Sequence, residues 1–142
     1  MSLMKKFATL LLLQIVIVLI LPAQVTEQAN YTSVDPYEFH MLYLLNDSAL
    51  VIDVREPFEY RGRRIRDAIN IPSSGNLEFA SDTIDWNYIL LFYCTTDWRS
   101  IRVAEYFYER GFRKVYSLRG GIVAWKKEGY PTIKREKRKR RK

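Results

Sequence analysis

Short apolar runs alternate with segments of helical character along most of the chain. The apolar runs, at 31–34, 49–52, 69–71, 89–93 and 115–117, have the length of buried strands. Helices are predicted between and after them, over 36–45, 56–61, 76–81, 100–110 and 122–128. Strands that alternate with helices favour a parallel sheet covered on both faces, so the predicted fold class is α/β.

The topology predicts where a ligand would bind. In parallel sheets of this kind, ligands bind beyond the carboxyl ends of the strands. The loops expected at that edge are 53–57, 72–75, 94–99 and 117–121. The topology places the basic cluster 61–66 at the opposite edge, as a solvated loop or, alternatively, as a patch that contacts a partner or a membrane.

Cys94, the only cysteine, is the main candidate for chemistry. It follows the apolar run 89–93 and opens a tight loop before a predicted helix. The N–H groups of such a loop and of the first helical turn lack internal partners and form an anion cradle. The helix dipole and Arg99 both favour a thiolate, which predicts a reactive nucleophile. The alternative is a structural cysteine, because free cysteines are often buried.

Length and composition indicate one exported domain. The chain has 142 residues, of which 48% are hydrophobic, enough for a single core. Lys5 and Lys6 precede the apolar run 7–21, so residues 1–23 are predicted to be a signal peptide or, if uncleaved, an N-terminal membrane anchor over 7–23. Either a signal peptide or an anchor predicts a periplasmic or other extracytoplasmic location.

A single cysteine excludes a framework of internal disulfides.

The positive charge is concentrated at the C-terminus. Residues 134–142 contain eight basic residues and one acidic residue, and the resulting +7 equals the net charge of the whole chain. Residues 132–142 are therefore predicted to be a disordered basic tail. The tail either contacts an anionic surface or is simply solvated. Export argues against specific nucleic-acid binding.

Several ordered motifs resemble those of a rhodanese domain. They are Val51-Ile52-Asp53-Val54-Arg55-Glu56-Pro57, Glu59-Tyr60, Ala68-Ile69-Asn70-Ile71-Pro72, Cys94 with Arg99-Ser100, and Leu118-Arg119-Gly120-Gly121 with Ala124-Trp125. The similarity covers residues 30–131. It is greatest to short exported single-domain thiosulfate sulfurtransferases of the phage-shock type. The resemblance implies a five-stranded parallel sheet with helices on both faces.

The resemblance also implies a reaction and its residues. Sulfane sulfur would pass from thiosulfate or a similar small donor to a thiol acceptor or cyanide, through a persulfide on Cys94, with no cofactor and no metal. The implied substrate-binding loop is Thr95, Thr96, Asp97, Trp98 and Arg99, and the implied supporting residues are Asp53, Arg55 and Ser100. Four residues separate Cys94 from Arg99, as in sulfurtransferases, whereas the dual-specificity phosphatases of this fold have one more.

Two departures from the family pattern keep a second function open. Asp97 stands where the family usually has glycine, which predicts a strained positive φ and a negative charge beside the anion site. The segment 63–67 replaces the usual Gly-His-Ile-Pro-Gly. The alternative function is therefore a catalytically weak rhodanese-fold binding module, in which Asp97 and Trp98 reshape the pocket for a protein partner.

Overall fold

The structure of the chain, a computed structural model, describes residues 31–134. The predicted signal peptide or anchor at 1–23 and residues 135–142 of the basic tail lie outside the described residues. Within 31–134, none of the helices has the length and apolar character needed to cross a membrane.

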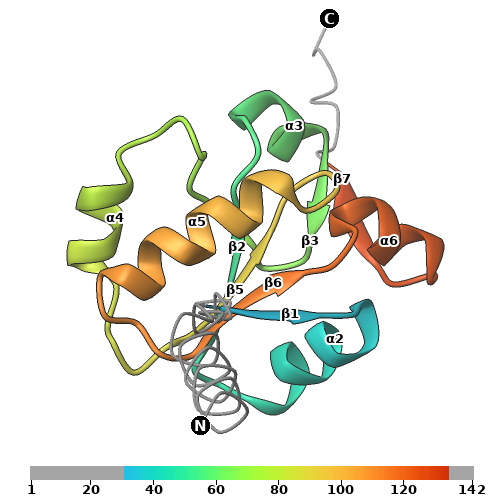
Figure 1. Cartoon of the computed structure of the whole chain (residues 1–142). Helices are drawn as coiled ribbons and strands as arrows, with labels where there is room; N and C mark the ends of the chain where they lie inside the picture. Colours follow the sequence, from blue (N-terminus) through green and yellow to red (C-terminus); the bar gives the residue numbers. More distant parts are fainter. Residues whose placement is uncertain (1–30, 135–142) are drawn as a thin grey trace, which may run out of the picture.

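The predicted five-stranded parallel sheet is confirmed, with strand order β1-β6-β5-β2-β4 (Figure 1). Its strands are β1 (Thr32–Val34), β2 (Ala49–Asp53), β4 (Ile69–Asn70), β5 (Ile89–Tyr93) and β6 (Val115–Leu118). β5 is central, so its carboxyl end has neighbouring strands on both sides.

Helices cover both faces of this sheet, as predicted. They are α2 (Pro36–Leu45), α3 (Pro57–Gly62), α4 (Leu77–Thr83), α5 (Trp98–Glu109) and α6 (Gly121–Lys127). α4 and α5 pack on one face, and α2 and α6 pack on the other (Figure 1). A capping box formed by Asp35 and Glu38 starts α2, with Pro36 in the first turn.

Strand β5 is buried on both faces, which explains its continuous apolar sequence. Leu90 and Phe92 belong to the core under α4 and α5, whereas Leu91 and Tyr93 belong to the core under α2 and α6. Successive side chains of a strand point to opposite faces. Cys94 continues this alternation and lies in the same core as Phe92.

A second, two-stranded sheet was not predicted. β3 (Arg63–Ile65) pairs antiparallel with β7 (Thr132–Lys134), and Arg63 stands opposite Lys134. The assignment of 132–134 to a disordered tail is therefore wrong. These three residues supply the backbone partners that β3 needs.

The predicted position of the basic cluster 61–66 is also wrong. The Arg63 carbonyl accepts a hydrogen bond of 2.7 Å from the Arg55 guanidinium, and Arg55 closely follows β2. The N–H of Ile65 donates to the hydroxyl of Tyr93, the last residue of β5, at 3.1 Å. The cluster thus begins at the carboxyl edge of the sheet. The reason is that α3 has only six residues and β4 pairs with Ile52 and Asp53, the last two residues of β2, so the chain between them stays near the carboxyl edge.

The expected backbone strain falls at a different aspartate. Asp97 has φ −163°, which is ordinary extended backbone, because it is the N-cap of α5, and α5 starts at Trp98 rather than at Ser100. Within 31–134, Asp67 is the one residue other than glycine with positive φ, at 58°. Aspartate tolerates this conformation better than most residues. The Asp67 carboxylate also accepts a hydrogen bond of 2.6 Å from the Tyr43 hydroxyl.

Candidate active site

Cys94 follows β5 directly, and the start of α6 packs against its backbone. The N–H of Ile122 donates to the Cys94 carbonyl at 2.9 Å, and the N–H of Val123 donates to the Thr95 carbonyl at 3.2 Å. Gly121, at φ +55°, makes this approach feasible, because a Cβ there would stand 2.3 Å from the Thr96 oxygen. The loop after Cys94 is therefore positioned by β5 on one side and by α6 on the other.

The loop leaves a row of backbone donors unused. The first N–H of α5 that is bonded within the protein is that of Ile101, which donates to the Asp97 carbonyl at 3.0 Å. The N–H groups of residues 95–100 have no acceptor among residues 31–134. These groups and the positive end of the α5 dipole together can bind an anion.

The Cys94 thiol lies beneath this loop with a serine hydroxyl beside it. Cys94 is only 1% exposed to solvent. The Ser100 Oγ lies 3.7 Å from Cys94 Sγ and 2.9 Å from the Asp97 carbonyl oxygen, so its single proton can be donated to either. The buried Ser117 hydroxyl donates to Ser100 Oγ at 3.0 Å. Sequence reasoning missed Ser117, which no motif singled out.

Arg99 binds a carboxylate that sequence reasoning also missed. Its two terminal nitrogens donate to Glu59 of α3 at 2.7 and 3.0 Å, a bidentate ion pair. This contact is the main cause of the raised pKa of Arg99, and the neighbouring Cys94 contributes less. The positive charge of Arg99 is thus shared between Glu59 and the Cys94 loop.

Glu59 is itself held in place by two further groups. The Thr95 hydroxyl donates to it at 2.9 Å, and the backbone N–H of Glu56 donates to it at 3.1 Å, in the capping box that starts α3. Hydrogen bonds from Arg99 above all, opposed by partial burial, lower the pKa of Glu59 to about 2. Arg99 also donates to Thr95 at 2.9 Å. The spacing of Glu56 and Glu59 was the available sequence signal, because it is that of a capping box.

Asp53 and Arg55 form a buried pair beside the end of β5. The Arg55 guanidinium donates to Asp53 at 2.6 Å, and both residues are buried. Burial alone would lower the pKa of Arg55, but the hydrogen bonds and charge of Asp53 raise it above its usual value. Within 31–134, neither side chain hydrogen-bonds to residues 94–99. The ring of Tyr93, the residue before Cys94, lies 5.6 Å from the guanidinium carbon of Arg55.

The remaining loop residues form the rim of the site. Thr96 is exposed and Asp97 is half-buried. Trp98 is 67% exposed, and the guanidinium of Arg102 lies over its ring at 5.7 Å. The structure therefore brings together Cys94, its loop and Ser100. Asp53 and Arg55 lie beside Tyr93, the residue before Cys94, and not beside the loop itself.

A comparison with known families matches residues 40–128 to the rhodanese-like domain. The chain belongs to the rhodanese-like family. A solved structure of a rhodanese-related protein from Thermoplasma volcanium is 29% identical and superposes with a TM-score of 0.65 over 75% of this chain and all of that one. The residues matched by the family, 40–128, include the strand, loop and helix around Cys94.

Curated relatives of this rhodanese-like chain include named sulfurtransferases. A sulfurtransferase from Allochromatium vinosum is 30% identical over 61% of this chain and 80% of its own length. The thiosulfate sulfurtransferase GlpE of Actinobacillus pleuropneumoniae is 27% identical over 72% of this chain and 93% of its own length. An uncharacterized protein from Synechocystis is 33% identical over 62% of this chain, which spans only 49% of that relative. The family is thus sulfurtransferase-like.

Proposed function

We propose that the protein is a sulfurtransferase that moves sulfane sulfur from thiosulfate or a similar donor to a thiol or cyanide through a persulfide on Cys94. The observation that carries this proposal is the position of Cys94 Sγ under a loop whose N–H groups at 95–100 are free to bind an anion. The names of the A. vinosum and A. pleuropneumoniae relatives support the same reaction class.

The proposed first half-reaction follows from this geometry. The Cys94 thiolate bonds to the outer sulfur of thiosulfate, and the sulfur–sulfur bond of thiosulfate breaks with its electron pair on the departing sulfite. The Ser100 hydroxyl and the free N–H groups stabilise the sulfur anions, and Arg99 attracts the anionic donor. Because the chain has no second cysteine, the persulfide does not collapse into an internal disulfide.

The mass of the intact protein tests this proposal. Incubation of the reduced, folded protein with thiosulfate is expected to add one sulfur atom, and cyanide or dithiothreitol is expected to remove it. In the Cys94→Ser variant the added mass should be absent. Intact-protein mass spectrometry before and after each reagent measures both steps.

Absence of the sulfur adduct on folded, reduced wild-type protein would overturn the sulfurtransferase proposal. That result would favour the alternative function, a catalytically weak binding module for a protein partner. The 67% exposure of Trp98 at the rim of the site is the observation that favours this alternative. This alternative would be supported if the wild-type protein bound a protein partner and the Trp98→Ala variant did not.

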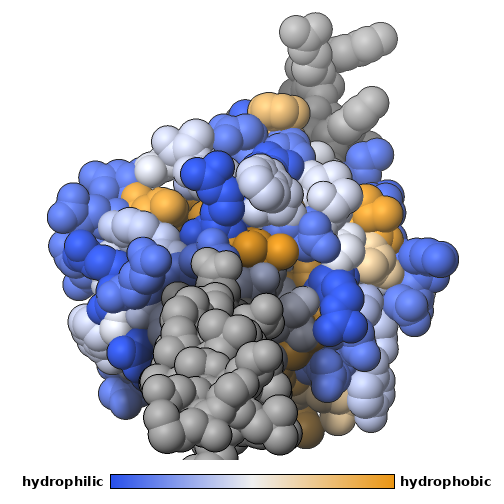
Figure 2. Space-filling view, viewed as in Figure 1, coloured by the Kyte–Doolittle hydropathy of each residue, from blue (hydrophilic) through white to orange (hydrophobic). Residues whose placement is uncertain are grey.

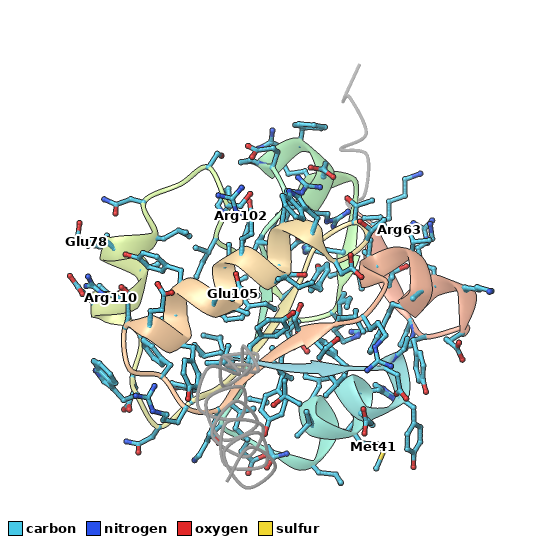
Figure 3. All side chains as sticks on the ribbon, in the orientation of Figure 1. Met41, Arg63, Glu78, Arg102, Glu105 and Arg110 are labelled. Atoms are coloured by element: carbon cyan, nitrogen blue, oxygen red, sulfur yellow. The ribbon has the colours of Figure 1, made fainter. Side chains whose placement is uncertain are left out.

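We also propose that the protein is exported and binds an anionic lipid surface through its basic residues. The pairing of β3 with β7 sets Arg63 beside Lys134, from which the basic residues 135–142 continue. Arg61, Arg63 and Lys134 are exposed. Two basic segments far apart in the sequence thus meet at one place. Figure 3 labels Arg63 at the right of the view, next to α6.

Vesicle binding tests this surface. The full chain is expected to bind vesicles containing anionic lipid more tightly than purely zwitterionic vesicles, and the difference should shrink as salt rises. Replacing Arg61 and Arg63 with glutamine is expected to reduce that difference about 30-fold, because two charges at about 1 kcal/mol each are removed. The apolar run 7–21 contributes equally to both vesicle types, so co-sedimentation with the two isolates the charge effect. Equal affinity for both vesicles would contradict the proposal.

A further inference from the structure

A groove of about 300 Å³ opens beside the Cys94 loop. One wall is a face of α5, and the other is formed by the start of α4 and the segment before it. The lining residues are Ser73, Leu77, Trp98, Arg99, Arg102, Val103 and Tyr106. Figure 3 shows Arg102 on the side of α5 that faces this segment. The volume suits a small ligand.

The groove carries positive charge and no lining carboxylate. Arg99 lies at the end of the groove next to the Cys94 loop, and its guanidinium forms an ion pair with Glu59. Arg102 has no acidic partner within ion-pair distance among residues 31–134. Its guanidinium lies over the Trp98 ring, which leaves its N–H groups available to a ligand.

The other acidic groups of this face are directed elsewhere. Glu78 and Asp82 of α4 both bind Arg110, at the far end of α5 (Figure 3). The negative charge of Glu105 is felt by the Tyr31 phenol. Burial is the main cause of the raised pKa of Tyr31, and the charge of Glu105 raises this pKa further. Within residues 31–134, Arg102 therefore lines the groove without an ion-pair partner.

Apart from its two arginines, the groove is mainly apolar and aromatic. Leu77 and Val103 contribute aliphatic surface, and Trp98 and Tyr106 contribute rings. On the coloured part of the face in Figure 2, hydrophilic residues predominate and apolar residues form small separate patches. This pattern favours a short organic ligand with one anionic end over a large protein partner.

We infer that this groove binds the thiol acceptor and that Arg102 selects acceptors with a carboxylate close to the thiol, an inference that rests on the sulfurtransferase activity proposed above. Arg102 lies about 4.5 Å further along the axis of α5 than Arg99, at 1.5 Å per residue. An acceptor whose thiol lies at the loop end of the groove, beside Arg99, would bring a carboxylate two or three carbons away within reach of Arg102. The class that fits is a short mercapto acid.

The transfer step balances with this acceptor. The acceptor thiolate bonds to the outer sulfur of the Cys94 persulfide, which takes up one proton from water after loading and keeps it through the transfer. The bond between that sulfur and Cys94 Sγ breaks, and its electron pair stays on Sγ. The acceptor leaves as a persulfide, Cys94 is again a thiolate, and one negative charge has passed from the acceptor to the protein.

Single-turnover discharge separates the acceptor from the donor. Protein already loaded with sulfur from thiosulfate is mixed with 3-mercaptopropionate or with neutral 2-mercaptoethanol, at equal thiolate concentrations, and loss of the persulfide is followed by mass. In Arg102→Gln the ratio of the two rates, acid over neutral thiol, is expected to fall about tenfold, the effect of losing one charge-assisted hydrogen bond. The matched control is Arg113→Gln, which removes the same charge beyond the far end of α5 and should leave the ratio unchanged.

An unchanged ratio in Arg102→Gln, or an equal fall in Arg113→Gln, would overturn the inference while leaving the sulfurtransferase proposal intact. Failure to load sulfur would instead count against the proposed function. The groove is then still testable in Cys94→Ser, by the shift of the Trp98 indole N–H signal on titration with 3-mercaptopropionate. We expect weaker binding in Cys94→Ser/Arg102→Gln, and equal binding in the two variants would also overturn the inference.

Discussion

Replacing Arg99 with alanine is expected to slow sulfur loading from thiosulfate by about 10- to 100-fold, which corresponds to roughly 1.5 to 3 kcal/mol of charge-assisted hydrogen bonding. The substitution removes the cation that attracts the anionic donor. It also leaves the Glu59 carboxylate, formerly 2.7 Å from Arg99, uncompensated next to the Cys94 loop. The rate of persulfide formation at several thiosulfate concentrations measures the effect.

A double-mutant cycle separates the two causes. Glu59→Gln/Arg99→Ala removes both charges and should load faster than Arg99→Ala alone, because no unpaired carboxylate remains beside the thiol. Arg99→Lys keeps the charge but loses the bidentate geometry, so it should fall between wild type and Arg99→Ala. If the double variant is as slow as Arg99→Ala, then the leftover carboxylate of Glu59 is not part of the loss.

The same ion pair predicts a pH dependence of stability. The pKa of Glu59 is about 2 in the folded protein, below the usual value of 4.5, chiefly because of the hydrogen bonds from Arg99. The stabilisation is therefore complete above pH 4.5 and is lost as the pH falls toward 2. Wild type should exceed Glu59→Gln in free energy of unfolding at pH 6, and the difference should shrink between pH 4.5 and pH 2. Urea unfolding at a series of pH values would show a constant difference if the pair contributes nothing.

The sheet could be predicted because its signals are local. The central strand β5 is a continuous apolar run, and Asp35 with Pro36 starts α2 by its own capping chemistry. The loop after Cys94 could likewise be located, because a strand, a loop and a helix follow one another in the chain. Such features require no knowledge of distant residues.

The features that the sequence did not predict depend on contacts between distant segments. β3 is a strand because Thr132–Lys134 pairs with it, about seventy residues further along the chain. The partner of Arg99 is Glu59, from a helix that no local pattern places beside the Cys94 loop. The strain expected at Asp97 rests on the family glycine alone. The position is instead an N-cap, and the positive φ lies at Asp67.

The largest expected effect on stability comes from Asp53. Asp53→Asn keeps the shape of the side chain but leaves the Arg55 guanidinium buried without a counter-charge. Breaking one partner of a buried pair typically costs about 3 to 5 kcal/mol. Asp53 is fully buried and Arg55 is 6% exposed, so solvent does not replace the lost partner. Equilibrium unfolding in urea is expected to show a loss of this size.

A matched double variant and an activity measurement show whether the Asp53–Arg55 pair contributes to stability alone or also to activity. Asp53→Leu/Arg55→Met removes both charges and should be more stable than Asp53→Asn, although the Arg63 carbonyl then loses its donor. Because neither side chain of the pair hydrogen-bonds to the Cys94 loop within residues 31–134, the folded fraction of Asp53→Asn at low temperature should load sulfur within about tenfold of wild type, one step of 1.4 kcal/mol. A loss as large as that of Arg99→Ala in fully folded Asp53→Asn would mean instead that the pair positions the nucleophile. Its role in this rhodanese-like fold would then extend beyond stability.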